Sequence, residues 1–352
     1  MSVIAYIGII LAAIVLAFGT ELLIVGLYPG LSPPRQDLGR RSRSPRQTAI
    51  TPAGSRRDVE FQVGGTTVRA WLFLPASTTS TVPCIIMAHG LGGTRNMGLD
   101  AYALRYQQAG MAALAFDYRY NGDSGGDPRQ LTSIPHQLED YAAAIEYARS
   151  LKEIDPRRIA LWGTSLSGGH VLVTAARDSG VACVAAQCPL LDGTETAEQH
   201  VKHMGIRYVL RMTVHGQRDM VRSWLRLSPH RIPIVGRPRT VALMANMDAW
   251  RTFSEMAPDD FVNEACARVA IRMDKYRPVK QLGKVICPVL LQVGDKDMAV
   301  PARVVNKAER LLGQHGQVIR YPIDHFDIYQ GDNFETAVDD QVRFFRNHLL
   351  RE

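Results

Sequence analysis

Ser165 lies in a sequence setting that favours covalent chemistry. The apolar run IALW at 159–162 leads into GTSLSGGH at 163–170, which predicts a strand, a tight turn and a helix. A serine at such a turn can act as a nucleophile if the residues two positions before and after it are small. Gly163 and Ser167 are both small, although the common G-x-S-x-G pattern has glycine at the second of these positions. The alternative role for Ser165 is to cap the helix.

Two aspartates are candidates for the acid that an activated serine requires to orient its base. The apolar run at 289–293 predicts a strand, and Asp295 and Asp297 follow it in a loop that leads to Pro301 and a predicted helix. Either carboxylate fits the place of the orienting acid, and either could instead cap that helix.

His325 is the histidine downstream of the serine that best fits a general base. It stands in YPIDHFD at 321–327, directly after a short predicted strand at 318–320. His315 lies in a GQHG turn and His348 lies in the last predicted helix, so neither follows a strand in this way.

An upstream loop offers backbone donors for an oxyanion. The apolar run CIIMA at 84–88 predicts a strand, and HGLGG at 89–93 follows it. A backbone N–H group of this loop, together with the one after the serine, would stabilise the negative charge that develops on a carbonyl oxygen. We expect His89 to pack the loop rather than to act as a base.

These motifs follow one another in the order found in α/β hydrolases, and residues 58–352 resemble that superfamily. The strand end FDYR at 116–119, followed by GDSGG at 122–126, belongs to the same series. More narrowly, GTSLSGGH at 163–170 and DHFDIY at 324–329 resemble X-Pro dipeptidyl-peptidase-like hydrolases and fungal polyketide transferases.

The resemblance implies a role for each candidate residue. Ser165 would be the nucleophile, His325 the general base, and Asp297 rather than Asp295 the orienting acid. The backbone N–H groups of Leu91 and Leu166 would form the oxyanion hole. No cofactor and no metal are implied.

Strands alternate with helices through most of the chain, which predicts a doubly wound, mostly parallel α/β sheet. The predicted strands are 59–63, 67–74, 84–88, 112–117, 158–162, 181–187, 287–293 and 316–321. The predicted helices are 99–109, 134–151, 166–178, 302–313 and 334–350.

Residues 191–282 interrupt this alternation and are expected to form a helical cap over the active site. The segment contains several methionines and aromatic residues that could line an apolar pocket, or could form the core of the cap itself. His200 and His203 could share a helix face, but no nearby carboxylate or cysteine completes a metal site.

The N-terminus predicts a membrane anchor. Residues 2–20 carry no charge and the apolar run continues to 28, which is long enough to span a bilayer. No lysine or arginine precedes the run, which argues against a secretory signal peptide, and the arginines after it favour a cytoplasmic catalytic domain. An uncleaved or cleaved signal sequence and a buried helix are the alternatives. Residues 29–57, rich in proline and arginine, predict a basic disordered linker.

The net charge of +7 comes largely from this N-terminal part. Residues 1–57 contain seven arginines and two acids, a contribution of +5, which leaves +2 for the remainder and no footprint for nucleic acid. The five cysteines lack metal-site spacing, and their odd number argues against a disulfide framework.

The function that these observations predict is acyl transfer through a serine ester, with water as the acceptor. The expected substrate is a lipophilic ester or thioester. A dehalogenase would carry aspartate at position 165, and a dienelactone-type hydrolase would carry cysteine there. The alternatives that stay open are an acyltransferase using the same triad, a proline-type peptidase and a non-catalytic membrane adaptor; the oligomeric state is left open.

Overall fold

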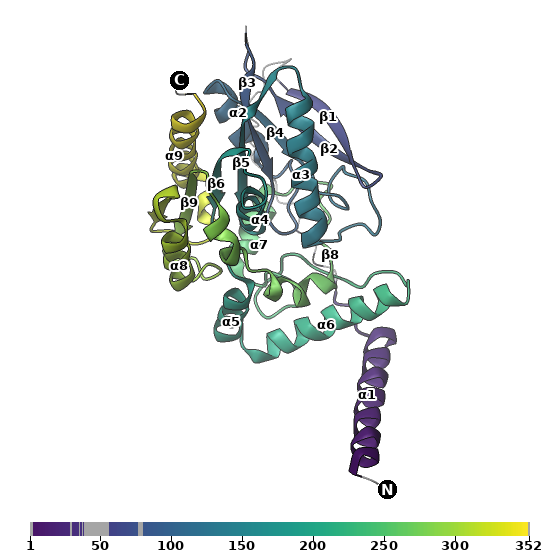
Figure 1. The fold of residues 1–352 in the computed structure, drawn as a ribbon. Helices are drawn as coiled ribbons and strands as arrows, with labels where there is room; N and C mark the ends of the chain where they lie inside the picture. Colours follow the sequence, from purple (N-terminus) through teal and green to yellow (C-terminus); the bar gives the residue numbers. More distant parts are fainter. Residues whose placement is uncertain are drawn as a thin grey trace.

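An eight-stranded sheet forms the centre of the molecule (Figure 1). The computed structural model of the chain describes residues 3–28, 30–34, 36, 38, 56–76 and 80–350. The strand order in the sheet is β1-β2-β4-β3-β5-β6-β9-β10. The strands are β1 (Arg56–Val63), β2 (Thr66–Phe73), β3 (Val82–Ala88), β4 (Ala112–Phe116), β5 (Ile154–Thr164), β6 (Val181–Gln187), β9 (Val289–Gly294) and β10 (Gly316–Tyr321).

The sheet is parallel except at one side. β1 pairs antiparallel with β2, and β2 pairs antiparallel with β4, whereas all other pairings in this sheet are parallel. β5 lies between β3 and β6, so its last residue, Thr164, is near the middle of the sheet. Since parallel strands end at the same edge, the loops that follow β3, β5, β9 and β10 converge there.

Helices cover both faces of the sheet, as the predicted doubly wound arrangement requires. The apolar cores place α3 (Ile134–Ser150), α4 (Leu166–Ala175) and α8 (Ala302–Leu312) on one face. The other face is covered by α2 (Leu99–Gln108) and α9 (Gly331–Leu349). The central strands are buried on both faces, which is why they appear in the sequence as continuous apolar runs.

A network of buried glutamines connects α9 to the central strands. The Nε2 group of Gln341 donates to the Oε1 atoms of Gln187 on β6, at 2.9 Å, and Gln292 on β9. The indole N–H of Trp162 donates to Gln341 Oε1 at 3.1 Å, and Gln187 Nε2 donates to the hydroxyl of Thr164 at 3.3 Å. Each amide thus has both donor and acceptor partners, as buried polar groups require.

Between β6 and β9 the chain forms additional elements beyond the carboxyl ends of the strands (Figure 1). They include α5 (Gly193–Met204), α6 (Ile206–Trp224), α7 (Met247–Met256), the short pair β7 (Arg231–Ile232) and β8 (Ala265–Cys266), and three 3₁₀ helices, Ala267–Ile271, Met273–Lys275 and Pro278–Lys284. Their apolar side chains form a core of their own, which also contains Leu91, from the loop after β3, and Leu166, the first residue of α4.

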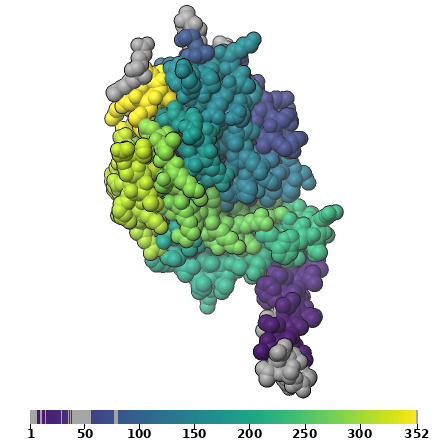
Figure 2. All heavy atoms as spheres, in the orientation of Figure 1, coloured from purple at the N-terminus to yellow at the C-terminus, as the bar shows by residue number. Residues whose placement is uncertain are grey.

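The N-terminal helix α1 (Val3–Leu27) projects away from the rest of the molecule (Figure 2). Within the described residues, Ile7–Leu27 is the helix long and apolar enough to cross a membrane, with a mean hydropathy of 2.5 over a window of 18 residues that is not buried. Its length and composition fit a membrane span or a signal sequence. Its C-terminal end contacts α6.

The segment predicted as a linker, residues 29–57, lies largely outside the described residues. Two of its described residues contact the elements that follow β6: Gln36 accepts a hydrogen bond from the Asn263 amide, and Leu38 packs against their apolar core. β1 begins at Arg56, three residues before the predicted strand, because Arg56 stacks on Trp71 at 4.6 Å and Arg57 pairs with Glu153 at 2.7 Å.

Candidate active site

Ser165 occupies a strained turn between β5 and α4. Its backbone has φ 55° and ψ −118°, a conformation that residues with a side chain rarely adopt. The turn requires glycine at position 163, because a methyl group there would lie 2.4 Å from the carbonyl oxygen of Ser167. The Ser165 N–H donates to the Gln187 carbonyl at 2.9 Å, and the Leu190 N–H donates to the Ser165 carbonyl at 2.8 Å. The neighbouring strand and loop therefore hold the turn on both sides.

Ser167, which stands where the common motif has glycine, is accommodated by a buried partner. Its side chain is fully buried, and its hydroxyl lies 2.6 Å from the Tyr141 hydroxyl of α3. Tyr141 also donates to the carbonyl of Trp162 at 3.0 Å. The additional hydroxyl at position 167 is thus hydrogen-bonded rather than stranded in the core.

Ser165, His325 and Asp297 lie in one hydrogen-bonded series. Nε2 of His325 is 3.2 Å from the Ser165 hydroxyl, and Nδ1 of His325 is 2.6 Å from Oδ2 of Asp297. The other carboxylate oxygen of Asp297 accepts the Ala299 N–H at 2.7 Å, which fixes the orientation of the carboxylate. Three loops far apart in the sequence, after β5, β9 and β10, bring these side chains together.

The competing residues of the sequence analysis lie elsewhere. The Asp295 side chain is 54% exposed, and its nearest basic partner is Arg320 at 4.0 Å. His315 lies at the turn before β10, and His348 packs on the Phe344 ring of α9, with ring centroids 4.6 Å apart. Asp297, and not Asp295, is therefore the acid that faces His325.

The environment of His325 favours its protonated form. Burial, the largest single influence, lowers the pKa of this histidine. The charge of Asp297, the hydrogen bond to it and the charge of Asp324 act in the opposite direction, and the net effect raises the pKa. Asp324 also accepts the backbone N–H of His325 at 2.6 Å. This arrangement suits a group that accepts a proton during a reaction and returns it.

The two predicted oxyanion donors border the same cavity as the serine and the histidine. Leu91 and Leu166 both line it. Leu166 is the first residue of α4, where backbone N–H groups have no partner within the helix and the helix dipole favours negative charge. Gly90 holds the other loop close, since a methyl group there would lie 2.9 Å from Cβ of Ser165. His89 is buried behind this loop, against Gly93.

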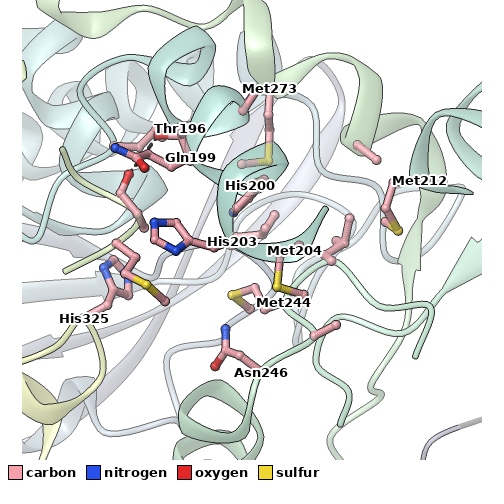
Figure 3. A pocket seen from close by; sticks show the side chains of 18 of the residues that line it. Thr196, Gln199, His200, His203, Met204, Met212, Met244, Asn246, Met273 and His325 are labelled. Atoms are coloured by element: carbon pink, nitrogen blue, oxygen red, sulfur yellow. Dashed lines mark hydrogen bonds between the residues drawn. The ribbon is translucent and has the colours of Figure 1, made fainter. Parts of the chain in front are cut away.

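A cavity of about 250 Å³ opens at the serine and is walled largely by apolar side chains (Figure 3). His325 lies at one end of the view and Met212 at the other, with His203 and Met204 between them. The methionines that line the cavity are Met204, Met212, Met244, Met273 and Met298. Unbranched, polarisable methionine side chains can adapt to an elongated apolar ligand.

His200 and His203 both line this cavity, and burial lowers the pKa of His200. Among the described residues, the group whose donor atoms are close enough to hold a metal ion is Cys188, Asp297 and His325. Two of these three residues already form the hydrogen-bonded pair beside Ser165, and burial raises the pKa of the Cys188 thiol well above its usual value.

The sequence analysis missed some residues around the site. Asp324 was given no role there, although its position next to His325 is a local signal for an electrostatic effect. The contacts of Tyr141 with Ser167 and of Tyr329 with Thr164, the latter at 2.6 Å, had no sequence signal, because they join residues distant in the chain.

Comparison with known proteins supports the fold and the class of enzyme. Residues 64–326 match the family described as X-Pro dipeptidyl-peptidase (S15 family). The chain is 39% identical over 293 residues to the quorum-quenching protein AidA of Acinetobacter baumannii, which covers 82% of this chain and 94% of AidA. It is 26% identical over 306 residues to the thiohydrolase aneE of Aspergillus aculeatus, covering 83% and 93% of the two chains.

Solved structures confirm the predicted α/β-hydrolase fold. The crystal structure of the α/β hydrolase GrgF from Penicillium sp. sh18 superimposes with a TM-score of 0.69 at 23% identity. The similarity covers 84% of this chain and 99% of GrgF. A protein of that name from Penicillium is described as a polyketide transferase.

Proposed function

The chain belongs to the X-Pro dipeptidyl-peptidase (S15) family and is an α/β-hydrolase enzyme; from this premise we propose that it cleaves a lipophilic ester or thioester through an acyl-serine intermediate. The observation that carries the proposal is the series from Ser165 through His325 to Asp297, with distances of 3.2 and 2.6 Å, at the mouth of an apolar cavity. Acyl transfer through a serine ester needs a nucleophile that is hydrogen-bonded to a base, and an acid that orients this base.

The proposed reaction has two halves. In the first, Nε2 of His325 takes the proton of Ser165 while Oγ attacks the substrate carbonyl carbon, and His325 then returns the proton to the departing alcohol or thiol. In the second, His325 takes a proton from water, the hydroxide attacks the acyl-serine, and Ser165 regains its proton as the acid leaves. Asp297 holds the imidazole with its proton on Nδ1, and the N–H groups of Leu91 and Leu166 stabilise the oxyanion of both tetrahedral intermediates.

The substrate class follows from the cavity. Its methionines and leucines favour an apolar acyl chain, since apolar atoms make up most of the cavity wall. Among the relatives, one is named a thiohydrolase and another a polyketide transferase, which supports an acyl group carried as an ester or thioester. Transfer to an alcohol or amine in place of water would use the same residues and differ only in the acceptor.

We further propose that α1 tethers the enzyme to a membrane, with the catalytic part on the cytoplasmic side. The apolar length of α1, whose one charged residue, Glu21, lies near its C-terminal end, and the arginines that follow it in the sequence support this orientation. A lipophilic substrate that partitions into the same bilayer would then be concentrated near the cavity.

Labelling with a fluorophosphonate probe tests the proposal directly, since the probe reacts with activated serines. Wild-type full-length protein should be labelled and should hydrolyse a panel of acyl esters, acyl lactones and acyl thioesters, with product analysis in the presence of added alcohols and amines. Ser165→Ala and His325→Ala should each abolish labelling and turnover, whereas His348→Ala, a histidine far from the serine, should leave both unchanged. Folded wild-type protein that is neither labelled nor active on any of these substrates would refute the proposal.

A further inference from the structure

The helix α6 has an exposed apolar face on the side of the molecule from which α1 extends. With 3.6 residues per turn, positions 206, 210, 221 and 224 of α6 fall on one face. Of these, Ile206 and Leu210 are 57% exposed and Trp224 is 67% exposed. The apolar residues Val201, Leu225 and Leu227 near the two ends of α6 are exposed as well.

The same face of α6 holds the end of α1. Gly26 of α1 packs so tightly on Val221 that a methyl group at position 26 would lie 2.6 Å from a Val221 methyl. Arg218 of α6 donates to the carbonyls of Val25, at 2.9 Å, and Tyr28, which have no partner within α1 because the helix ends there. The junction of the two helices is therefore fixed by apolar packing and by charged hydrogen bonds.

If α1 spans a bilayer, the exposed apolar face of α6 is turned toward that bilayer. α6 lies across the end of α1, at the end of the molecule that is farthest from β1 and the amino ends of the strands (Figure 1). Leu210 is eleven residues from Val221, or about 16 Å along the helix, and Trp224 is about 5 Å away on the other side. The exposed apolar residues thus flank the point where α1 departs.

A row of arginines runs beside this apolar face. Arg207, Arg211, Arg218 and Arg222 have the spacing of a second stripe on α6. Arg218 and Arg222 bond the carbonyls at the end of α1, whereas Arg207 and Arg211 are exposed and form no ion pair with any other described residue. An apolar face bordered by arginines and ending in tryptophan has the composition of a helix that lies in the interface of a membrane.

We propose that α6 lies flat in the headgroup region of an anionic bilayer, with Leu210 and Trp224 inserted toward the acyl chains and Arg207 and Arg211 bound to lipid phosphates. The inference rests on the proposed membrane span of α1 for its geometry, but not on the hydrolase chemistry. The opposite side of α6 supplies Tyr208, Val209 and Met212 to the cavity beside the serine. The lipid and the substrate site would therefore be separated only by the diameter of α6.

Site-directed fluorescence on the full-length protein tests this placement. All five native cysteines are buried, and burial raises the pKa of each thiol, so an introduced surface cysteine can be labelled selectively. Leu210→Cys and Trp224→Cys each carry an environment-sensitive nitrobenzoxadiazole probe. Arg157→Cys is the control, because its side chain is 90% exposed and lies near the amino ends of the strands, away from α6.

The protein is reconstituted in vesicles of phosphatidylcholine and phosphatidylglycerol, with and without lipids that carry a doxyl quencher near the headgroup. We expect a blue shift and quenching at positions 210 and 224 and neither at 157. Arg207→Glu combined with Arg211→Glu should reduce the quenching at 210, whereas Arg343→Glu combined with Arg346→Glu on α9 should not.

The outcomes separate the two membrane proposals, because resistance of the protein to carbonate extraction reports on α1 alone. In one outcome the protein resists extraction, but the probes at 210 and 224 are as exposed to water as the probe at 157. This outcome would overturn the interfacial placement of α6 and leave the span of α1 intact. Extraction of the protein together with loss of the probe signals would overturn both. A blue shift at 210 that grows with protein concentration in lipid-free detergent would assign the face to a second copy of the chain and would likewise overturn the proposal.

Discussion

Replacing Asp297 by asparagine tests the arrangement around His325 with the smallest change in shape. Oδ1 of Asp297 accepts the Ala299 N–H at 2.7 Å, so an asparagine would keep its carbonyl oxygen there and turn its amide group toward Nδ1 of His325. An amide N–H₂ group cannot accept the proton of Nδ1. The imidazole would then carry its proton on Nε2, which faces the Ser165 hydroxyl at 3.2 Å and could no longer accept the serine proton.

The expected loss is large because the wrong tautomer disables the base while the oxyanion hole and the cavity remain. The corresponding change in serine proteases lowers kcat by about four orders of magnitude. With about 1.36 kcal/mol for each factor of ten, this is about 5.5 kcal/mol of lost transition-state stabilisation. Asp295→Asn is the matched control: it makes the same chemical change two residues away, on a side chain that is half exposed.

The assay is the hydrolysis of a p-nitrophenyl acyl ester by purified full-length protein, with circular dichroism to confirm that both variants fold. Asp295→Asn should stay within about twofold of the wild-type kcat, since exposed carboxylates of this kind contribute little. If folded Asp297→Asn protein retained more than about a tenth of the wild-type kcat, or if Asp295→Asn lost as much, the assignment of the acid would be refuted.

Three further predictions concern the turn, the base and the cavity. Gly163→Ala should destabilise the fold by about 3 kcal/mol or more in urea unfolding, because its methyl group would lie 2.4 Å from a backbone oxygen; Gly283→Ala, with open space at that position, should not, and equal stability of the two would contradict the packing. Asp324→Asn removes a negative charge that raises the pKa of His325, so the acidic limb of the pH profile of kcat/KM should move to lower pH; no shift, or a shift to higher pH, would contradict this role. Met212→Trp should lower kcat/KM for long acyl chains by about tenfold and leave acetyl esters unaffected, as measured with an ester chain-length series; equal losses for all lengths would place Met212 outside the acyl site.

The positions of most strands and helices were predictable because their signals are local. The predicted strand at 84–88 is part of β3, Val82–Ala88, and the predicted helix at 99–109 corresponds to α2, Leu99–Gln108. Boundaries differed where long-range contacts extend an element, as at β1, or where no capping side chain marks its start. The latter applies to α9, which begins at Gly331 rather than 334 after Gln330, whose side chain forms no cap.

The residues of the candidate site likewise fall into those that have a local sequence signal and those that have none. Ser165 and His325 stand in short motifs that are recognisable in the linear sequence, whereas Asp297 was preferred to Asp295 only through the resemblance to α/β hydrolases. The residues that support them could not be predicted, because their contacts depend on which strands are neighbours in the sheet. Nothing in the spacing of Arg218 indicated that it would bond the end of α1, 190 residues earlier in the chain.

The glutamine network affects how the protein can fold while it is being synthesised. Gln341 belongs to α9, which follows all eight strands of the sheet in the chain, yet it completes the hydrogen bonds of Gln187 and Trp162 on strands made long before. His325 is likewise made 160 residues after Ser165. Since a nascent chain folds from its N-terminus as it emerges, the strand that leads to Ser165 must wait with unfilled amide partners until α9 has emerged. We therefore expect the protein to stay inactive until α9 has emerged from the ribosome, and a chain released before that point to be long but inert.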